Sequence, residues 1–180
     1  MPAGRTRSAI LTAARTLIAG SPPGSPLPSV GAVAAGAGVS RLSIYHHFGS
    51  KAGLERAIAE EAGRPGTAPP PGSGALERLR HRIATACGRW SSDPRLFRRL
   101  PSAAAETTGP DHDHDRQLAM ALAESDLLRP GCSLREAEDV IGVVTSFAAF
   151  DRLYGDGRRS LPAVIEILNR MVGSILRSQP

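Results

Sequence analysis

The chain has 180 residues, of which 41% are hydrophobic and 22% charged, and its formal net charge at pH 7 is +5. This balance is typical of a globular protein of one or two domains, and no apolar run is long enough to span a membrane. Arg15 interrupts the one N-terminal stretch that could form the core of a signal peptide, so the chain is expected to be cytoplasmic.

The excess positive charge lies in the first third of the chain. Residues 1–60 contain six Lys or Arg against two Glu, whereas residues 61–180 contain sixteen basic against fifteen acidic residues. Charge concentrated in one segment favours binding of that segment to phosphates. Because 21 of the 22 basic residues are Arg, the abundance of Arg by itself indicates a composition bias and says little about function.

Apolar residues near the N-terminus recur at helical spacing. They predict a helix from about Arg7 to Ala19, ended by Gly20 and preceded by a loose arm at residues 1–5. The proline-rich residues 21–28 then predict a rigid connection. The buried face of the helix is expected to consist of Ile10, Ala13, Ala14, Leu17 and Ile18.

Residues 29–48 predict two short helices joined by a tight turn. The first helix, from Val30 to Ala37, has an apolar face, and Gly38 follows it where the turn requires a positive φ. Ser40 is a suitable N-cap for the second helix, from Arg41 to about His47, which directs Ile44 inward. Its outward side chains combine hydrogen-bond donors, rings and an apolar Leu. This pattern favours a helix-turn-helix with its second helix in a DNA groove, although plain core packing of a helical hairpin would use the same turn.

The residues in and around this turn match the sequence motif of a known family. The chain resembles the N-terminal domain of the TetR/AcrR transcriptional regulators over roughly residues 5–60, through Val33-Ala34-x-x-Ala37-Gly38-Val39-Ser40 and Ile44-Tyr45-x-His47-Phe48-x-Ser50-Lys51-x-x-Leu54. The resemblance implies a homodimeric transcriptional repressor that binds a palindromic operator in double-stranded DNA. It also implies that a small ligand releases the protein from this operator. The proline-rich connection before the helix-turn-helix departs from the family pattern.

The side chains of the second helix are the expected contacts with DNA. Arg41 has the fork geometry for guanine and suits a phosphate equally, Leu42 suits a thymine methyl, and Ser43 suits either contact. Neighbouring side chains are expected to hold phosphates or, as helix caps, to lie near the DNA backbone: Tyr45, His46, His47, Lys51, Ser29 and Ser40. For His47, packing of the hairpin is the alternative role.

Proline and glycine divide the rest of the chain. Ser50 is expected to cap a helix from Lys51 to about Ala62, and residues 63–74 cannot continue it. We therefore expect a DNA-binding domain with its linking helix at 1–62, a linker at 63–74 and a helical regulatory domain at 75–180. No strand-like alternation of useful length is present in the sequence, so the predicted fold class is all-α.

Helical spacing predicts about five helices in the regulatory domain. They cover residues 75–91, a short segment opened by Asp93-Pro94, and residues 116–128, 134–154 and 161–177. A short helix around 103–107 is left undecided. Ser133-Leu-Arg-Glu136 matches a capping box, in which each of the two end side chains binds the backbone N–H of the other.

The last two predicted helices carry two apolar stripes each, so each has two surfaces to cover. The family resemblance implies that they pair with their copies as a four-helix dimer interface. The alternative is that both stripes are buried within one subunit. The residues assigned to the interface are Ala137, Ile141, Val144, Ala148, Leu168, Val172 and Ile175.

The resemblance also places an effector pocket among the C-terminal helices. Bulky side chains on separate helices are expected to line it, with Cys87 or Thr145 as polar groups, and no charge is clearly directed inward. We therefore expect a small, neutral or weakly polar, lipophilic ligand. The lining residues are Trp90, Phe97, Leu100, Met120 and Phe147, for each of which ordinary core packing is the alternative.

An enzyme and a regulator controlled by a protein partner are the competing functions. The only candidate metal cluster is Asp111-His-Asp-His-Asp115, where His112 and His114 alternate with carboxylates. Ligands two residues apart diverge on a helix and no second cluster completes a site, so a polar loop ending in a helix cap is favoured and no metal or cofactor is expected. Cys87 and Cys132 lack ligand spacing and favour reduced thiols over a redox pair.

Overall fold

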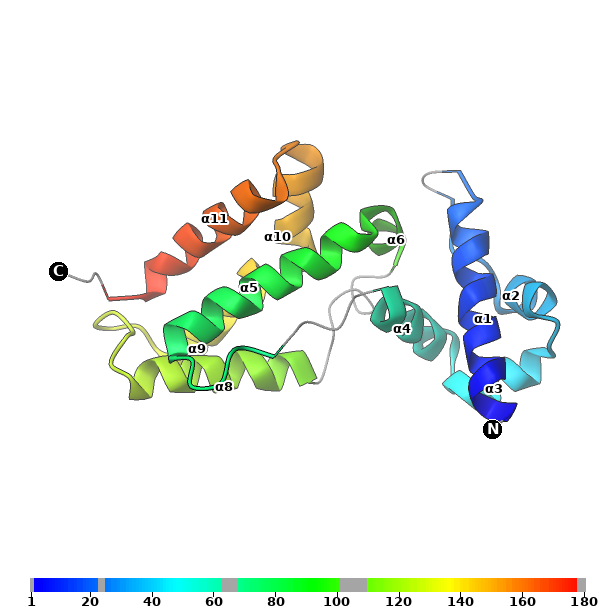
Figure 1. Ribbon diagram of the computed structural model, residues 1–180, viewed down its shortest axis with the longest axis horizontal. Coiled ribbons are helices and arrows are strands. Elements are labelled where there is room, and N and C mark those ends of the chain that lie inside the picture. The colour runs from blue at the N-terminus through cyan, green and yellow to red at the C-terminus, as the bar shows by residue number, and fades with distance from the viewer. Residues whose placement is uncertain (1, 23–24, 63–67, 101–109, 178–180) are drawn as a thin grey trace. The chain divides into compact units, whose positions relative to one another are not determined.

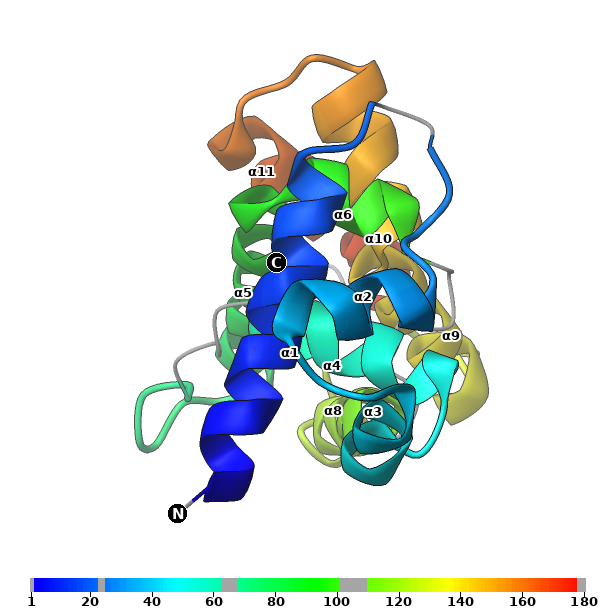
Figure 2. The same ribbon diagram turned by 90° about the vertical axis from the view of Figure 1, so that its right-hand side faces the viewer.

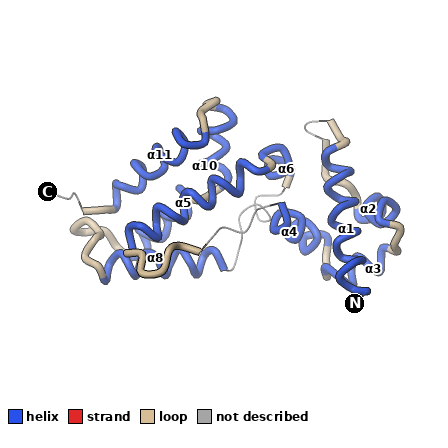
Figure 3. The backbone as a smooth tube through the Cα atoms, in the orientation of Figure 1, coloured by secondary structure: helices blue, strands red, loops and turns tan. Residues whose placement is uncertain are grey.

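The computed structural model describes residues 2–22, 25–62, 68–100 and 110–177 (Figure 1). Within these ranges the regular elements are helices, no strand occurs, and one isolated antiparallel bridge joins Leu128 to Leu176 (Figure 3). The predicted all-α class is confirmed. The chain divides into two compact units, one of residues 1–64 and 93–105 and the other of residues 65–92 and 106–180. No described helix combines the length and the apolar character that crossing a membrane requires.

The first unit contains the four helices of the N-terminal segment. They are α1 (Pro2–Ala19), α2 (Val30–Ala37), α3 (Arg41–Phe48) and α4 (Lys51–Ala62). α1 packs against α2 and α4, and α4 packs against α3 (Figure 2). Their facing side chains form one core, because each of the following is at most 6% exposed: Ile10, Ala14, Ile18, Val33, Ile44, Leu54 and Ile58.

The N-terminal end of α1 corrects one expectation. The helix begins at Pro2, so the loose arm expected at residues 1–5 is wrong from residue 2 onward. Proline fits the first turn of a helix because the N–H that it lacks has no intrahelical partner there. Pro2 is therefore the sequence signal for the start of this helix, and it was missed.

A short helix after the linker also belongs to the first unit. This helix, α6 (Pro94–Arg99), follows α5 in the chain but groups with residues 1–64. The guanidinium of Arg99 donates to the carbonyl oxygens of Ile18, Ser25 and Pro26, the last two at 3.1 and 3.2 Å. These bonds attach α6 to the end of α1 and to the proline-rich connection. The expected domain of residues 75–180 thus contains a segment that the structure groups with the N-terminal helices.

The second unit consists of helices drawn from the rest of the chain. They are α5 (Ala75–Ser92), α8 (Pro110–Glu124), α9 (Leu134–Val144), α10 (Phe147–Asp151) and α11 (Leu161–Val172). α8 packs against α9, and α11 packs against both α5 and α9. Seven large side chains of this core are 0% exposed, namely Leu79, Ile83, Leu118, Leu122, Ile141, Phe150 and Leu168.

Local caps set two helix starts that the sequence predicted. Oδ1 of Asp93 and Oγ of Ser133 each accept the backbone N–H three residues further on, both at 3.1 Å. Such bonds satisfy N–H groups that the first turn of a helix leaves without a partner. The reciprocal half of the capping box at Ser133 is replaced, because the carboxylate of Glu136 accepts a hydrogen bond from Arg129.

The start of α8 overturns the predicted polar loop. The helix begins at Pro110, so His112 and His114 lie within it, and it ends at Glu124 instead of Leu128. Proline and acidic residues both suit a first helical turn. Asp115, expected as a cap, is buried, and its Oδ1 accepts a hydrogen bond from Nε of Arg82 at 3.2 Å. The undecided helix around 103–107 lies outside the described residues.

The single helix predicted at 134–154 is also wrong, because the chain breaks after α9. The hydroxyl of Thr145 donates to the carbonyl of Ile141 at 2.8 Å, and Oγ of Ser146 accepts the N–H of Ala149 at 3.2 Å. Side-chain bonds of this kind compete with the helical backbone pattern and start a new helix. α10 then continues as a π-helix, η1 (Arg152–Asp156).

The last predicted helix ends early as well. α11 stops at Val172, and a 3-10 turn, η2 (Gly173–Ile175), leads into the bridge between Leu176 and Leu128. The guanidinium of Arg177 donates to both carboxylate oxygens of Asp126, at 2.7 and 2.9 Å. The residues after η2 are therefore extended and attached to the connection between α8 and α9.

Candidate nucleic-acid interface

The turn between α2 and α3 depends on Gly38. Its φ of +66° and ψ of +32° lie in the left-handed region, which glycine adopts without the strain that a β-carbon brings. The N–H of Gly38 donates to the carbonyl of Ala35 at 3.2 Å, and the N–H of Val39 donates to Ala34 at 3.0 Å. A β-carbon at position 38 would meet no atom within 4 Å, so the requirement is for the backbone angle and not for space.

α3 is fixed to the first unit at its start and along one face. Oγ of Ser40 accepts the backbone N–H of Ser43 at 3.1 Å and lies 3.0 Å from its hydroxyl oxygen. Ile44 is 0% exposed and anchors the helix in the core. Ser29 caps α2 in the same way, because its Oγ accepts the N–H of Ala32 at 3.1 Å. Both serines assigned to the DNA backbone are thus helix caps.

The opposite face of α3 is open to solvent. Leu42 is 77% exposed and Tyr45 is 45% exposed, and the side chains of Arg41 and His46 are exposed beside them. A shallow hollow on this face is lined by Ser40, Leu42, Ser43, Tyr45, His46 and His47. The structure therefore brings six of the nine predicted DNA contacts onto one surface, which presents hydroxyl, phenol, imidazole and aliphatic groups together.

The aromatic rings at the end of α3 connect this surface to α1. The ring centroids of His46 and His47 lie 5.7 Å apart, and those of His47 and Phe48 lie 6.3 Å apart. The guanidinium of Arg7 lies over the Phe48 ring, 4.9 Å from its centroid. Because His47 is half-buried and also lines the hollow, it meets the geometry of both roles that the sequence left open.

Lys51 lies at the start of α4, beyond the end of α3. Its side chain is 56% exposed, and its Nζ lies 3.5 Å from a carboxylate oxygen of Glu55 one turn further along. Glu55 is largely buried, whereas more than half of the Lys51 side chain is open to solvent, so the ammonium remains accessible to a phosphate. Gly31 is the position that the sequence analysis missed, since the guanidinium of Arg41 lies directly against it.

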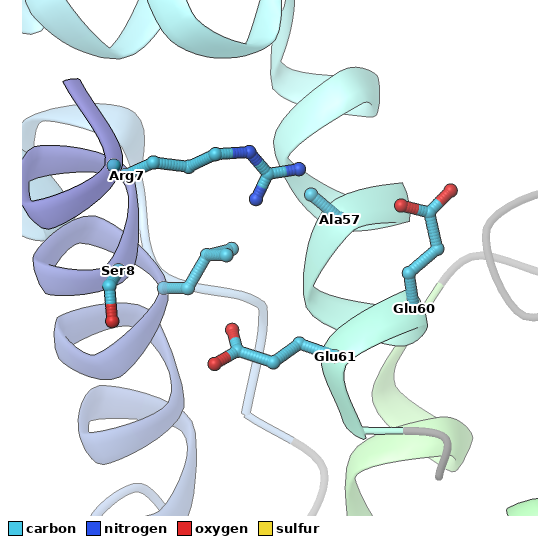
Figure 4. Close-up of a pocket in the computed structure, with 7 residues that line it drawn as sticks. Arg7, Ser8, Ala57, Glu60 and Glu61 are labelled. Carbon is cyan, nitrogen blue, oxygen red and sulfur yellow. The ribbon is translucent and has the colours of Figure 1, made fainter. Parts of the chain in front are cut away.

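A second hollow of the first unit lies between α1 and α4. It is lined by Gly4, Arg7, Ser8, Leu11, Ala57, Glu60 and Glu61 (Figure 4). The side chain of Arg7 extends toward α4, and that of Glu61 extends toward α1. Two carboxylates here make this surface unfavourable for phosphate, in contrast to the face of α3, where no acidic side chain lines the hollow.

The predicted effector residues are distributed over both units. Trp90 and Phe147 meet in the second unit, with ring centroids 5.5 Å apart. Phe97 and Leu100 are buried residues of the first unit. Met120 lies on α8 and is 44% exposed. Of the five, Trp90 and Phe147 are the pair whose rings the structure brings into contact within the second unit.

The predicted dimer interface needs correction. Ala137, Ile141, Val144, Leu168, Val172 and Ile175 are each at most 2% exposed within a single protomer. Side chains enclosed by their own subunit have no surface left for a partner, so the alternative of burial within one subunit holds for these six. Ala148 alone of the assigned residues is exposed.

The metal and thiol alternatives concern the Asp111–Asp115 cluster and the two cysteines. Among the described residues, no group of three or more His, Cys, Asp and Glu side chains is placed to hold a metal ion. The side chain of His112 lies outside the described part of the structure. Burial raises the pKa of the Cys87 thiol to about 12, so this thiol is protonated at neutral pH and is a poor nucleophile. Both cysteines are free thiols.

Comparison with known proteins finds the same architecture among bacterial transcriptional regulators. Residues 10–58 match the model of the family described as bacterial regulatory proteins, tetR family. No curated protein sequence matches the chain. NalD of Pseudomonas aeruginosa, the secondary repressor of the MexAB-OprM multidrug efflux pump, matches with a TM-score of 0.61, 19% identity and coverage of 100% of both chains. The fatty acid degradation regulator FadR of Bacillus halodurans matches with a TM-score of 0.63, 14% identity and coverage of 94% of this chain and 93% of its own.

The hairpin of α2 and α3, with its glycine turn and the exposed face of its second helix, has the geometry of a helix-turn-helix. The family match covers most of α1 to α4, including all of that hairpin. Residues 10–58 are thus similar to the DNA-binding domain of the tetR family of bacterial regulatory proteins, and the solved structures that match share the fold of the chain.

Proposed function

We propose that the chain is a dimeric repressor that binds a two-fold-symmetric DNA site through α3 and leaves it when a small lipophilic effector binds. The observation that carries the proposal is the exposed face of α3, where an aliphatic side chain 77% open to solvent lies among hydroxyl, phenol and imidazole groups. This mixture suits a major groove, which offers donors, acceptors and thymine methyl groups. Because chromosomal DNA is the proposed partner, the cytoplasm is the proposed place of action.

The two ends of the hollow suggest a division of roles. Leu42 and Ser43, in the first turn of α3, are proposed to contact base edges, since the N-terminal residues of a recognition helix approach the bases. Tyr45, His46 and His47 lie further along the hollow and are proposed to hold phosphates. Lys51, at the start of the next helix, is proposed to hold a phosphate beyond them.

Exposed apolar side chains of α9 and α11 support a revised dimer surface. Val143 is 56% exposed and Met171 is 46% exposed, although both belong to helices that bury one face in the core. Large exposed apolar groups are typical of protein interfaces when they are grouped. We infer that the dimer forms through these outward side chains with Ala148. A dimer would place two copies of α3 about one turn of DNA apart, or a multiple of it.

The proposed effector would act beside an aromatic cluster in the second unit. Trp90, Phe147, Phe150 and Tyr154 follow one another, with centroid separations of 5.5, 6.3 and 4.8 Å. Nε1 of Trp90 donates to the carbonyl of Thr145 at 3.4 Å, at the break between α9 and α10. A π-helix follows the break, and such turns are frequent at functional sites. The solved structures that match include a regulator of fatty acid degradation, which favours a lipophilic class of ligand.

Trp90 provides the test of this function, because it is the only tryptophan of the chain. We expect medium-chain fatty acids and related lipophilic metabolites to include one that changes Trp90 fluorescence saturably and releases bound DNA over the same concentration range. Only a ligand with different affinities for the DNA-binding and released states can shift one to the other. Fluorescence titration and DNA-binding anisotropy on the same samples measure both effects.

A Phe147→Ala variant is the control for location. The Phe147 side chain contacts Trp90 and lies outside the first unit. The variant should therefore bind DNA at the wild-type level in the absence of ligand, while its response to the ligand weakens. Ligands that quench Trp90 and leave DNA affinity unchanged throughout the screen would contradict release by a lipophilic effector.

A further inference from the structure

Gly31, in the first turn of α2, lies directly under the guanidinium of Arg41. A β-carbon at position 31 would lie 2.5 Å from Nη2, 2.9 Å from Nε and 3.0 Å from Cζ of Arg41. Atoms that are not bonded do not approach so closely, so this arrangement exists only because residue 31 has no side chain. We call this contact of the Arg41 guanidinium with Gly31 the seat of Arg41. It joins α2 and α3 through one polar side chain.

The backbone gives no other reason for glycine at this position. Gly31 is absent from the residues with positive φ among the described part of the chain, and it lies inside a regular helix. Glycine within a helix is less favourable than alanine. The absence of a side chain therefore lowers helix stability and, in return, leaves room for the guanidinium.

We propose that Gly31 is a positioning residue that seats Arg41 against α2, where the guanidinium grips a DNA phosphate and does not read a base. This proposal rests on the proposed binding of DNA by α3. In a helix-turn-helix the first helix crosses the DNA backbone, whereas the second lies in the groove. The Arg41 guanidinium lies on the first helix, and the hollow that the α3 side chains line does not include it.

The seat acts by limiting the conformations of a long side chain. Arginine has many rotamers in solution, and ordering such a side chain on binding opposes association. The seat already holds the guanidinium on the side of the hairpin that is proposed to face the DNA backbone. Less conformational entropy is then lost when DNA binds. A β-carbon at position 31 would displace only the flexible end of Arg41, so the fold itself should tolerate it.

The test is Gly31→Ala in the full-length protein. Binding is measured by fluorescence anisotropy over a series of KCl concentrations, on the duplex that the wild type selects from a random library and on a scrambled duplex of the same length. We expect affinity to fall by about 2–10-fold on both duplexes, which corresponds to reordering one long side chain. The melting temperature should stay level or rise, because alanine is the better helix former.

Three matched variants assign the effect to Arg41. Gly36→Ala changes the same helix, but its β-carbon would make only ordinary contacts, 3.5 Å from Cβ of Ala13 and 3.7 Å from Cδ1 of Leu17, and should leave binding unchanged. Arg41→Ala and Lys51→Ala should each lower the slope of log affinity against log salt by about one. Gly31→Ala should add its effect to Lys51→Ala and add nothing in the Arg41→Ala background.

Each other result overturns the proposal in a recognisable way. Wild-type affinity in Gly31→Ala, with weakened binding in Arg41→Ala, would show that the seat does not position the guanidinium. If Arg41→Ala lost affinity only for the selected duplex and kept the wild-type salt slope, Arg41 would read a base. If the wild type bound neither duplex, the proposed function and this inference would fail together.

Discussion

Leu168→Glu is expected to unfold the second unit instead of separating two folded subunits. Leu168 lies on α11 and is 0% exposed within one protomer. The change removes the burial of a large aliphatic side chain and forces an unpaired carboxylate into the core, which together cost about 5 kcal/mol or more. A loss of that size is comparable with the entire stability of a typical domain. Far-UV circular dichroism should lose helical signal, and Trp90 emission should shift to the red.

Two variants separate this outcome from an interface effect. Leu168→Met keeps the volume and the apolar character, so it should remain folded with less than about 1.5 kcal/mol of lost stability. Met171→Glu places the same charge one turn further along α11 at a side chain that is 46% exposed, and it should keep its helical signal. A Leu168→Glu protein that stayed helical and became monomeric would restore Leu168 to a subunit interface.

Met171→Glu combined with Val143→Glu is expected to dissociate the dimer while both units stay folded. The two side chains are 46% and 56% exposed in one protomer, so a carboxylate at either position is solvated in the monomer. In the dimer it would be desolvated without a partner, which opposes association. Because two linked α3 helices bind one site together, loss of the dimer should weaken DNA binding by about 100- to 10 000-fold. Light scattering and anisotropy measure the two effects.

Met120→Glu is the matched control for this prediction. Met120 is a methionine of the same unit with nearly the same exposed fraction, 44%, but it lies on α8. Met120→Glu should leave both the mass in solution and the DNA affinity unchanged. If Met120→Glu dissociated the protein and the double variant did not, the interface would lie on α8 and the assignment to α9 and α11 would be wrong.

Helices α2, α3 and α4 were predictable because their starts are set by local signals. Ser29, Ser40 and Ser50 each cap the helix that follows, and Gly38 supplies the positive φ of the turn. Such signals depend on a few neighbouring residues and can be read without knowledge of the fold. The exposed face of α3 follows from them, since fixing Ile44 inward directs the other side chains outward.

The second unit was less predictable because its decisive contacts join residues far apart in the chain. An apolar stripe shows that a face is covered but not which subunit covers it, and Ile141 and Leu168 are covered by their own. The break at Thr145 had a local signal, since Ser146 is an N-cap, but an apolar pattern continuing on both sides concealed it. The seat of Arg41 on Gly31 had no sequence signal, because only the packing of α2 on α3 brings the two together.

The most direct test of DNA binding through α3 is to recover the fragments of its own genome that the purified protein selects, alongside a Leu42→Ala/Tyr45→Ala variant. Both side chains are exposed, so the variant should fold like the wild type. We expect the wild type to enrich fragments with a shared two-fold-symmetric sequence and the variant not to do so. Equal enrichment of the same fragments by both proteins would contradict it.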